Sequence, residues 1–259
     1  MIINGNILAE KILDKLKDKK TSKEFVAILV GDDPASLSFL KQKEKVAESL
    51  GVIFRLEILS EELSQAELES RVRSISQEEK TGALIVQLPL PKKYNKVPVL
   101  NAIGIRKDVD VLNGETTSIL PPSVGALEEI LQSINFNTEG KTAVVIGPGM
   151  LIGEPVAKYL MKCTKKLLIL NKGAVDKESV QEGDLVVVSA GVPRLVTSEH
   201  IKEGAVVIDY GYKRENGKLT GDVDFEEVKE IASFITPTPG GTGPLVVAKL
   251  FENFFKLVD

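Results

Sequence analysis

The sequence has 259 residues, of which 43% are hydrophobic and 27% are charged. This balance excludes a disordered chain, and the length predicts one large or two modest domains. Thirty-three basic and 37 acidic side chains give a net charge of −4, which offers no whole-chain attraction to nucleic acid or to an anionic membrane. With one cysteine and one histidine, we expect no internal disulfide and no metal site.

The first predicted element is an amphipathic helix near the N-terminus. Ile7, Leu8, Ile12 and Leu16 recur at roughly helical intervals, and charged residues interrupt the apolar run. The segment therefore differs from a secretion signal, and no stretch of the chain approaches the ~20 apolar residues that span a bilayer. We expect a cytoplasmic protein.

Short apolar runs rich in β-branched residues then alternate with segments of helical periodicity. Such runs are typical of parallel strands covered by helices on both faces. The predicted strands are 25–30, 52–58, 83–86, 143–146, 167–170, 185–189 and 205–208. The predicted helices are 34–50, 63–78, 123–134, 153–161 and 225–231, with a last one from about Pro244. The alternation predicts an α/β fold with parallel sheets.

A turn-rich segment, 113–123 (NGETTSILPPS), divides the chain. A new β-α-β series begins after it. We place the boundary between two domains near Ile119.

Lys43 is the first candidate catalytic residue. It lies one helical turn after Phe39, on the apolar face of the helix predicted for 34–50. An inward-facing lysine loses hydration, which lowers its pKa toward the range where it acts as a base. The alternative is that the ammonium group extends past its neighbours into water or pairs with a carboxylate.

Two other polar positions follow strand-like segments. Gln87 ends a predicted strand and precedes two prolines, so its amide is expected at the carboxyl edge of a sheet, where open α/β sheets bind ligands. Asp108 and Asp110 share a face if their segment is extended, and one of them can accept hydrogen bonds from a heterocycle. The alternatives are a glutamine that satisfies loop backbone groups and a solvated acidic loop.

A glycine-rich loop follows the predicted strand 143–146. Gly147, Gly149 and Gly153 form G-x-G-x-x-x-G, one residue longer than the common dinucleotide fingerprint. Glycine lets the backbone approach a pyrophosphate, and the N-terminus of the next helix supplies free N–H groups. The loop predicts dinucleotide binding, with a plain strand-to-helix turn as the alternative.

The end of the next predicted strand bears on the choice of dinucleotide. Asn171 and Lys172 stand where an NAD-binding protein usually has an acidic residue for the ribose hydroxyls. A lysine there can instead contact a 2′-phosphate. The pattern favours NADP, with NAD as the alternative.

Seven motifs, in order, make the chain resemble the bifunctional methylenetetrahydrofolate dehydrogenase/cyclohydrolase family. They are PASLSFLKQKEKVAESLG, VQLPLP, KDVD, VVIGPGMLIGEP, VVIDYG, GDVDF and ITPTPGGTGP, which cover nearly the whole chain. The resemblance implies a homodimer whose subunits each have two α/β domains around a cleft. A folate-binding catalytic domain (1–118) would be completed by the C-terminal helix (244–259), and residues 119–243 would form a Rossmann-like nucleotide-binding domain.

The resemblance also implies roles for individual residues. Lys43 matches the family's catalytic lysine, Gln87 the glutamine hydrogen-bonded to it, and Asp110 the aspartate that binds the pterin ring. Phe39 stands where the family has a tyrosine that stacks on the folate. The implied nucleotide-binding residues are Gly147, Pro148, Gly149, Gly153, Asn171, Lys172 and Tyr212, and Pro239, Gly240 and Gly241 would line the cleft.

Two reactions of one-carbon metabolism and purine biosynthesis follow from the resemblance. Methylenetetrahydrofolate would be oxidised to methenyltetrahydrofolate with NADP, and the product would be hydrolysed to formyltetrahydrofolate. The hydrolysis needs a proton acceptor beside a cationic substrate. A neutral Lys43 oriented by Gln87 fits this role, because burial and nearby positive charge both lower its pKa.

Several positions depart from the family's pattern. Phe39 keeps a stacking face but lacks a hydroxyl group, Val111 replaces a glycine, Pro148-Gly149 replace an Arg-Ser pair, and 120–123 replace Pro-Cys-Thr-Pro. Two alternative functions therefore stay open. One is a dehydrogenase with weak or lost cyclohydrolase activity that uses NAD, and the other is a non-catalytic dinucleotide-binding regulator.

Overall fold

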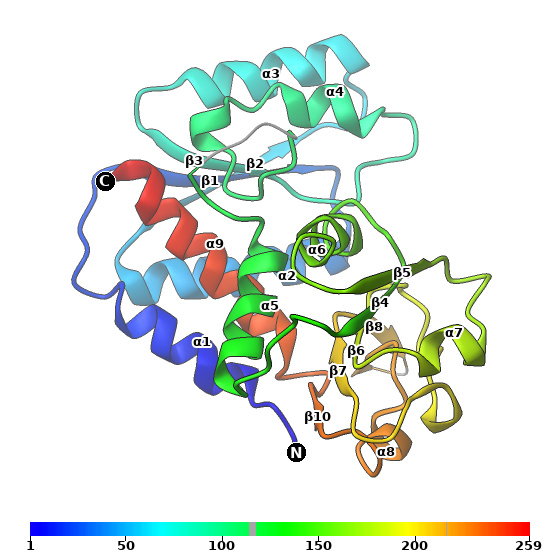
Figure 1. Ribbon diagram of the computed structural model, residues 1–259. Coiled ribbons are helices and arrows are strands. Elements are labelled where there is room, and N and C mark those ends of the chain that lie inside the picture. Colours follow the sequence, from blue (N-terminus) through cyan, green and yellow to red (C-terminus); the bar gives the residue numbers. More distant parts are fainter. Residues whose placement is uncertain (114–117, 216) are drawn as a thin grey trace. The chain divides into compact units, whose positions relative to one another are not determined.

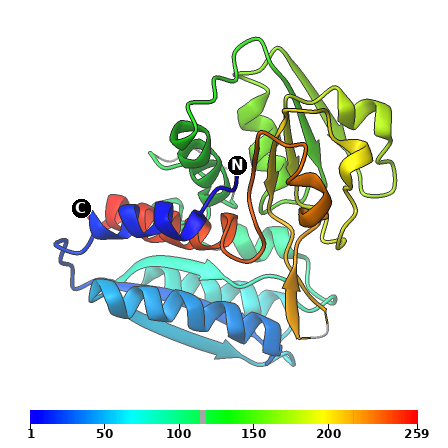
Figure 2. The same cartoon turned by 90° about the horizontal axis from the view of Figure 1, so that it is seen from below.

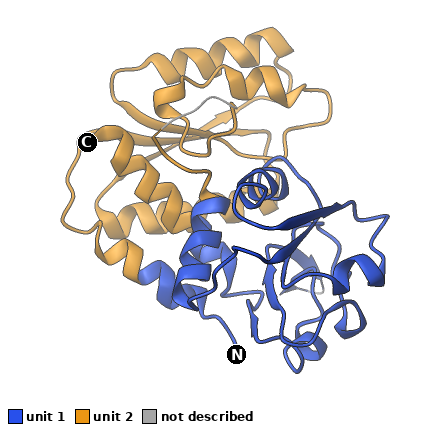
Figure 3. Ribbon diagram, in the orientation of Figure 1, with its two compact units in different colours: residues 1–10, 123–246 blue, residues 11–122, 247–259 orange. Residues whose placement is uncertain are grey.

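The structure is a computed structural model that describes residues 1–113, 118–215 and 217–259 (Figure 1). The chain divides into two compact units (Figure 3). Unit 1 comprises residues 1–10 and 123–246, and unit 2 comprises residues 11–122 and 247–259. Residues 1–10, which the sequence assigned to the first domain, thus group with the second series of strands. Part of the predicted boundary segment, residues 114–117, lies outside the described residues.

Unit 2 is built on a three-stranded parallel sheet in the order β2-β1-β3. Its strands are β1 (Glu24–Val30), β2 (Ile53–Leu59) and β3 (Thr81–Val86). Its helices are α2 (Pro34–Leu50), α3 (Gln65–Gln77) and α4 (Lys96–Asn101), with a 3-10 turn at Ile105–Lys107. Two further helices, α1 (Gly5–Asp14) and α9 (Thr242–Val258), have residues in both units. In Figure 1, α3 and α4 cover one face of the sheet, and α2 and the later part of α9 lie on the other.

Local sequence sets the ends of α2. The carboxylate of Asp33 accepts a hydrogen bond from the N–H of Ser36 at 2.7 Å, and Pro34 occupies the first turn, where its missing N–H costs nothing. The helix stops at Gly51, which adopts the left-handed conformation with φ +66°. These signals place Lys43 in the middle of a rigid helix.

Aromatic packing ties the C-terminal segment into unit 2. The ring of Phe25 on β1 lies 5.0 Å from the ring of Phe251 and 5.7 Å from that of Phe254, both on α9. All three side chains are fully buried. The last helix therefore forms part of the core beneath β1.

Unit 1 is built on a five-stranded parallel sheet in the order β10-β7-β6-β4-β5. Its strands are β4 (Thr142–Ile146), β5 (Lys166–Leu170), β6 (Leu185–Val188), β7 (Val206–Asp209) and β10 (Phe234–Ile235). Its helices are α5 (Pro122–Ser133, which starts one residue before the unit), α6 (Gly153–Leu160), α7 (Lys177–Gln181) and α8 (Phe225–Val228), with a 3-10 turn at Ser198–His200. A narrow antiparallel hairpin of β8 (Lys213–Glu215) and β9 (Lys218–Thr220) extends from this sheet (Figure 2).

The strand order of unit 1 creates a topological switch point at β4. The chain passes from β4 to β5 on one side and then returns to β6 on the other side of β4. Ligands of open α/β sheets bind at the carboxyl ends of strands at such a point. The glycine-rich loop that begins at Gly147 follows β4 directly.

The predicted α/β class with parallel sheets and a Rossmann-like nucleotide-binding unit is confirmed. Each predicted strand and helix is present, with small shifts at its ends. The short elements α4, α7, β8, β9 and β10 were not predicted. Among the described helices, none combines the length and apolar character needed to cross a bilayer.

Candidate active site

Unit 2 brings Lys43 and Gln87 into direct contact. Lys43 Nζ donates a hydrogen bond to Gln87 Oε1 at 3.0 Å. Gln87 Nε2 donates to the carbonyl of Leu88 at 2.7 Å, which turns the amide oxygen toward the lysine. Gln87 directly follows β3, and its backbone N–H still bonds to Ile28 on β1. The amide is therefore held by the sheet edge while the lysine is held by α2.

The position of Lys43 on α2 removes its ammonium group from water. Leu40 and Ala47, one turn before and after it on the same face, are 1% and 0% exposed. Burial lowers the pKa of Lys43, while the negative charge of Asp110 opposes this shift. Lowering the pKa increases the fraction of neutral amine, the form that accepts a proton.

Asp110 lies close enough to Lys43 for the two charges to influence each other. Burial raises the pKa of Asp110 to about 6, the ammonium group of Lys43 opposes the rise, and the carboxylate of Asp108 adds to it. The arrangement brings together an amine, an amide and a carboxylate whose charge acts on the amine. This carboxylate can accept hydrogen bonds from a ligand with adjacent N–H donors, such as an aminopyrimidinone ring.

Asp108 holds the segment that carries Asp110. It forms an isolated parallel bridge with Leu84 on β3, and its side chain is fully buried. Its carboxylate accepts hydrogen bonds from the backbone N–H groups of Asp110 at 3.1 Å, Leu112 at 2.8 Å and Asn113 at 3.0 Å. The sequence suggested that Asp108 and Asp110 share a face. In the structure, the carboxylate of Asp108 binds backbone N–H groups of its own segment, whereas the charge of Asp110 acts on Lys43.

A second buried side chain, Asn253 on α9, holds the same segment from the other side. Its Nδ2 group donates to the carbonyl oxygens of Val109 at 3.0 Å and Leu120 at 2.8 Å. Asn253 is not among the residues predicted from the sequence. An amide among the aromatic residues of a buried helical face (FENFF) is the signal that could have identified it, because buried polar groups need partners.

The backbone at Val111 is strained. Its φ is +56°, in the left-handed region that β-branched residues rarely adopt. The hydrogen bonds to Asp108 on either side of Val111 hold the chain in this conformation. Strain of this kind is often found next to functional residues.

Replacing Val111 with glycine is expected to stabilise the protein by about 1 kcal/mol. Removing a β-branched side chain from the left-handed conformation stabilises the folded state by about 1–2 kcal/mol. Glycine also gives the unfolded chain more conformational freedom, which offsets part of this stabilisation. Urea unfolding monitored by circular dichroism measures the difference. Asn135→Gly is the matched control, because Asn135 also has positive φ (+53°) but asparagine tolerates it, so little change is expected. A Val111→Gly variant less stable than the unmodified protein would contradict the strain.

Phe39 lies on α2 one turn before Lys43 and is partly buried. Its ring supplies a flat apolar surface on the same helix as the lysine. Phenylalanine has no hydroxyl group, so its side chain offers a flat face for stacking and no hydrogen-bond donor or acceptor.

In unit 1, the loop after β4 has the form of a phosphate cradle. Gly147 has φ +85°, and a Cβ atom there would lie 2.6 Å from the carbonyl oxygen of Ser189. A Cβ on Gly153 would lie 2.0 Å from the carbonyl oxygen of Gly147, whereas one on Gly149 would meet no atom within 4 Å. Two glycines thus close the loop on itself, and the third leaves open space that a ligand can approach.

The helix that follows this loop suits an anion. The residue before α6, Ile152, offers no side-chain hydrogen bond to the first turn. In the first turn, the N–H of Glu154 donates to the carbonyl of Gly149 at 2.9 Å and Pro155 has no N–H. The N–H of Gly153 and the positive end of the helix dipole are therefore what the helix offers to a phosphate. Gly147, Pro148, Gly149 and Gly153 fit the pyrophosphate of a dinucleotide.

The other predicted nucleotide-binding residues lie at neighbouring strand ends. Asn171 and Lys172 follow β5 and are exposed, and Tyr212 follows β7 and is partly buried. Since β5 and β7 lie on opposite sides of β4 in the sheet, these residues can meet different halves of a dinucleotide that crosses the switch point.

The predicted cleft loop Pro239–Gly241 packs against the N-terminal segment in unit 1. Gly5 N donates to the carbonyl oxygen of Gly240 at 2.8 Å, and a Cβ atom on Gly5 would lie 1.7 Å from that of Gly241. Gly240 has φ +94°, which favours glycine. Close contacts therefore fix Gly240 and Gly241 of this loop, together with Gly5.

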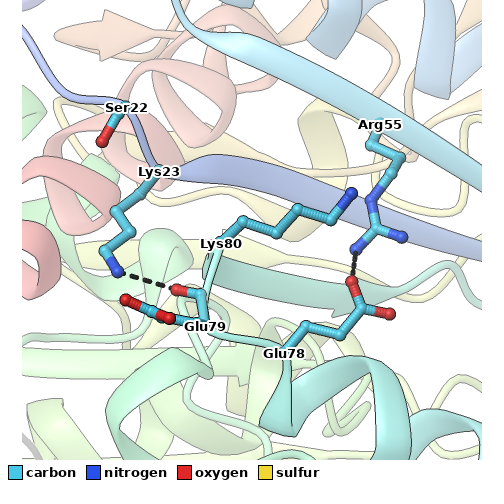
Figure 4. Close-up of a pocket in the computed structure, with 6 residues that line it drawn as sticks. All are labelled: Ser22, Lys23, Arg55, Glu78, Glu79 and Lys80. Carbon is cyan, nitrogen blue, oxygen red and sulfur yellow. Dashed lines mark hydrogen bonds and ion pairs between the residues drawn. The ribbon is translucent and has the colours of Figure 1, made fainter.

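A separate hollow of about 740 Å³ lies at the amino ends of β1 and β3 in unit 2 (Figure 4). Its lining residues are Ser22, Lys23, Arg55, Glu78, Glu79 and Lys80. Arg55 forms 2.7 Å ion pairs with Glu24, Glu57 and Glu78, and Lys23 donates to the carbonyl of Glu79 at 2.7 Å. Arg55 and Lys80 of this hollow pair with neighbouring carboxylates, and the hollow contains none of the predicted site residues. Within the described ranges, no three His, Cys, Asp or Glu side chains form a metal-binding group.

Fold and site together define the class of protein: an α/β enzyme with a dinucleotide-binding unit. The model of the tetrahydrofolate dehydrogenase/cyclohydrolase catalytic domain matches residues 3–110, and that of the NAD(P)-binding domain of the same family matches residues 121–259.

Individual proteins of this family are similar to the chain in sequence and in structure. Bifunctional protein FolD of Staphylococcus haemolyticus is 37% identical over 251 residues, which cover 93% of this chain and 88% of that protein. The crystal structure of FolD methylenetetrahydrofolate dehydrogenase/cyclohydrolase from Campylobacter jejuni has a TM-score of 0.93 at 34% identity, covering 100% of this chain and 98% of that one. Trypanosoma brucei FolD, solved with NADP and an inhibitor, gives a TM-score of 0.92 at 30% identity, with 100% and 97% covered.

The chain belongs to the tetrahydrofolate dehydrogenase/cyclohydrolase family. It is an enzyme of folate one-carbon metabolism, with an oxidoreductase and a hydrolase activity.

Proposed function

We propose that the protein oxidises methylenetetrahydrofolate to methenyltetrahydrofolate with NADP and hydrolyses the product to formyltetrahydrofolate. The observation that carries the proposal is the 3.0 Å hydrogen bond from Lys43 to Gln87, made by an ammonium group on which the charge of Asp110 also acts. Burial of the ammonium group favours a neutral amine, which a regulator without catalytic activity has no need to maintain.

In the hydrolysis, Asp110 accepts hydrogen bonds from the pterin ring and so fixes the methenyl carbon. Neutral Lys43 removes a proton from the water that adds to this carbon. The bond from this carbon to one folate nitrogen then breaks: that nitrogen takes the proton back from Lys43, and the added hydroxyl releases its own proton to water and becomes the formyl oxygen. Gln87 accepts a hydrogen bond from the amine of Lys43 and so keeps the lone pair of the amine nitrogen directed at the water. The positive charge of the substrate lowers the pKa of Lys43 further, so a larger fraction of the amine is neutral when the substrate is bound.

When bound to the loop 147–153, an oxidised nicotinamide dinucleotide supplies the hydride acceptor for the first reaction. The chain's contribution is alignment: the loop fixes the pyrophosphate, Asp110 fixes the pterin ring, and Phe39 stacks on the folate. The folate nitrogens stabilise the cation that remains, so no acid or base from the protein is required in this step.

The family resemblance supports the remaining features of the proposal, and one relative supports the choice of NADP. Lys172 at the end of β5 favours NADP over NAD, and Trypanosoma brucei FolD was solved with NADP. We propose that the protein is a cytoplasmic homodimer that serves purine biosynthesis through formyltetrahydrofolate. The limits 1–118 with 244–259 for the folate domain and 119–243 for the nucleotide domain belong to the same proposal.

Steady-state kinetics with NADP and NAD in parallel test the proposed oxidation. We expect kcat/KM to be about tenfold or more higher with NADP, because a lysine that contacts a 2′-phosphate contributes a charge-assisted hydrogen bond. If neither NADP nor NAD is reduced in the presence of methylenetetrahydrofolate, the dehydrogenase function is refuted. Equal or better use of NAD would refute the role of Lys172.

A further inference from the structure

Two buried aspartates lie outside the residues that the proposed reactions use. Asp209 ends β7 in the motif VVIDYG, and Asp222 follows the β8–β9 hairpin in the motif GDVDF. Asp209 is 3% exposed and Asp222 is 0% exposed. Their carboxylates hydrogen-bond to backbone N–H groups from three loops of unit 1.

Asp222 fixes the segment that follows β6. Its Oδ2 atom accepts hydrogen bonds from the N–H of Ala190 at 2.6 Å and of Gly191 at 2.8 Å. The same segment packs against the nucleotide loop, because Ser189 Oγ donates to the carbonyl of Gly147 at 2.7 Å. Hydrogen bonds to a carboxylate are stronger than those between neutral groups. One side chain thus sets the backbone on which the loop after β4 rests.

Asp209 holds Asp222 in place. Its Oδ1 atom accepts from the N–H of Gly211 at 2.7 Å and of Asp222 at 3.2 Å, and its Oδ2 atom accepts from Val223 at 3.1 Å. Gly211 leaves no room for a side chain, since its Cβ would lie 2.3 Å from Cγ of Asp222. The two carboxylates therefore interlock the chain after β6 with the chain after β7, next to Tyr212.

Burial of these two carboxylates opposes folding. Burial raises the pKa of Asp209 to about 7, and the charge of Asp222 adds to the rise. Burial also raises the pKa of Asp222, whose Oδ1 atom has no hydrogen-bond partner within the described chain. Burying two neighbouring carboxylates costs more free energy than burying apolar side chains of similar size, so packing alone does not explain them. Their placement at the carboxyl ends of the strands, where the ligand binds, gives them a use.

The two sides of the switch point receive different parts of the cofactor. With the pyrophosphate on the loop after β4 and the 2′-phosphate near Lys172 after β5, the nicotinamide half extends over the ends of β6 and β7. The loops joined by Asp222 lie at those ends.

We propose that Asp222, held by Asp209, is a positioning residue for the nicotinamide half of the dinucleotide. It is fully buried and does not touch the ligand. Its carboxylate acts through the N–H groups of Ala190 and Gly191, whose backbone it keeps in the conformation that receives the cofactor. This inference rests on the proposed function, because it assigns a task within the dinucleotide site.

The variants Asp222→Ala and Asp222→Asn test the proposal. Alanine removes both hydrogen bonds, and we expect the KM for NADP and the Kd for NADPH to rise about tenfold or more. Asparagine keeps an oxygen acceptor without the charge, and we expect the KM for NADP and the Kd for NADPH to rise about threefold. In both variants the KM for methylenetetrahydrofolate and the nucleotide-free hydrolysis of methenyltetrahydrofolate should stay within about twofold, because Lys43, Gln87 and Asp110 belong to unit 2. A merely structural role would weaken dinucleotide binding, folate binding and hydrolysis together.

Asp184→Ala is the matched control. The carboxylate of Asp184 also accepts a backbone N–H, that of Thr142 at 2.9 Å, and pairs with Lys202, but at the amino ends of β4 and β6. We expect this variant to lose stability and to keep its affinity for NADPH.

Unchanged NADPH affinity in a folded Asp222 variant would overturn the proposal, as would equal losses of affinity and hydrolysis. If Asp222→Ala does not fold, Asp222→Asn decides alone by the same criteria. Binding of NADPH, measured by its fluorescence, needs no turnover. A failure of the proposed reactions in the unmodified protein is therefore distinguishable from a failure of this inference.

Discussion

Replacing Lys43 with methionine is expected to slow the hydrolysis of methenyltetrahydrofolate by about 10²–10⁴-fold, the usual contribution of a general base. Methionine fills the space of the lysine stem between Leu40 and Ala47 but has no group that accepts a proton. Gln87 Oε1 also loses its 3.0 Å partner. The measurement is the loss of substrate absorbance in the absence of nucleotide, corrected for the reaction in buffer.

The control for this variant is Lys41→Met, which changes the same residue type on an exposed position of the same helix. We expect it to hydrolyse methenyltetrahydrofolate like the unmodified protein. NADPH affinity should be unchanged in both variants, since the glycine loop belongs to unit 1. Hydrolysis that survives in Lys43→Met would remove Lys43 from its proposed role, and equal losses in both variants would indicate a general effect of charge.

The second large effect is expected at Gly153, where an added Cβ would lie 2.0 Å from the carbonyl oxygen of Gly147. No flexible side chain can move aside there, because the obstacle is backbone. Gly153→Ala should therefore displace the loop, lower the free energy of unfolding by about 1–3 kcal/mol and weaken NADPH binding by about tenfold or more. Urea unfolding and NADPH fluorescence measure the two effects.

Gly149→Ala separates binding from folding. Its Cβ would meet no atom within 4 Å, so the variant should be as stable as the unmodified protein. The added methyl group would still enter the space in which the backbone approaches a pyrophosphate, and we expect NADPH affinity to fall. A stable Gly149→Ala variant with full NADPH affinity would contradict the placement of the pyrophosphate on this loop.

Local sequence signals predicted the elements that carry the site. Asp33, Pro34 and Gly51 mark the two ends of α2, and the predicted and observed bounds of this helix agree. The inward position of Lys43 follows from helical periodicity alone. The glycine loop after β4 is equally local, since its three glycines and the flanking apolar strand are adjacent in sequence.

Short elements escaped prediction because few residues specify them. Helix α4 has six residues with Pro98 among them, and β10 has two residues. In the sequence, an Asn-Gly pair, a common turn signal, separates the strands of the β8–β9 hairpin, but each strand has only three residues. None of these elements contains a predicted site residue.

Long-range contacts were not predictable in the same way. The bond between Asn253 and Val109 joins residues 144 positions apart, and the bonds of Asp222 to Ala190 and Gly191 span more than thirty. No periodicity or turn signal encodes such pairs. The grouping of Lys43 with Gln87 and Asp110 likewise rested on the family resemblance rather than on any local pattern.

The pH dependence of nucleotide-free hydrolysis tests most directly whether the ammonium group of Lys43 is held out of water to serve as a base. Because burial lowers the pKa of Lys43 from its ordinary value of 10.5, the enzyme-specific rate should rise with pH and approach a plateau below that value. The Lys43→Met variant should show no such rise above the buffer reaction. An enzyme-specific rate that does not depend on pH, or that keeps the same profile without Lys43, would contradict the account.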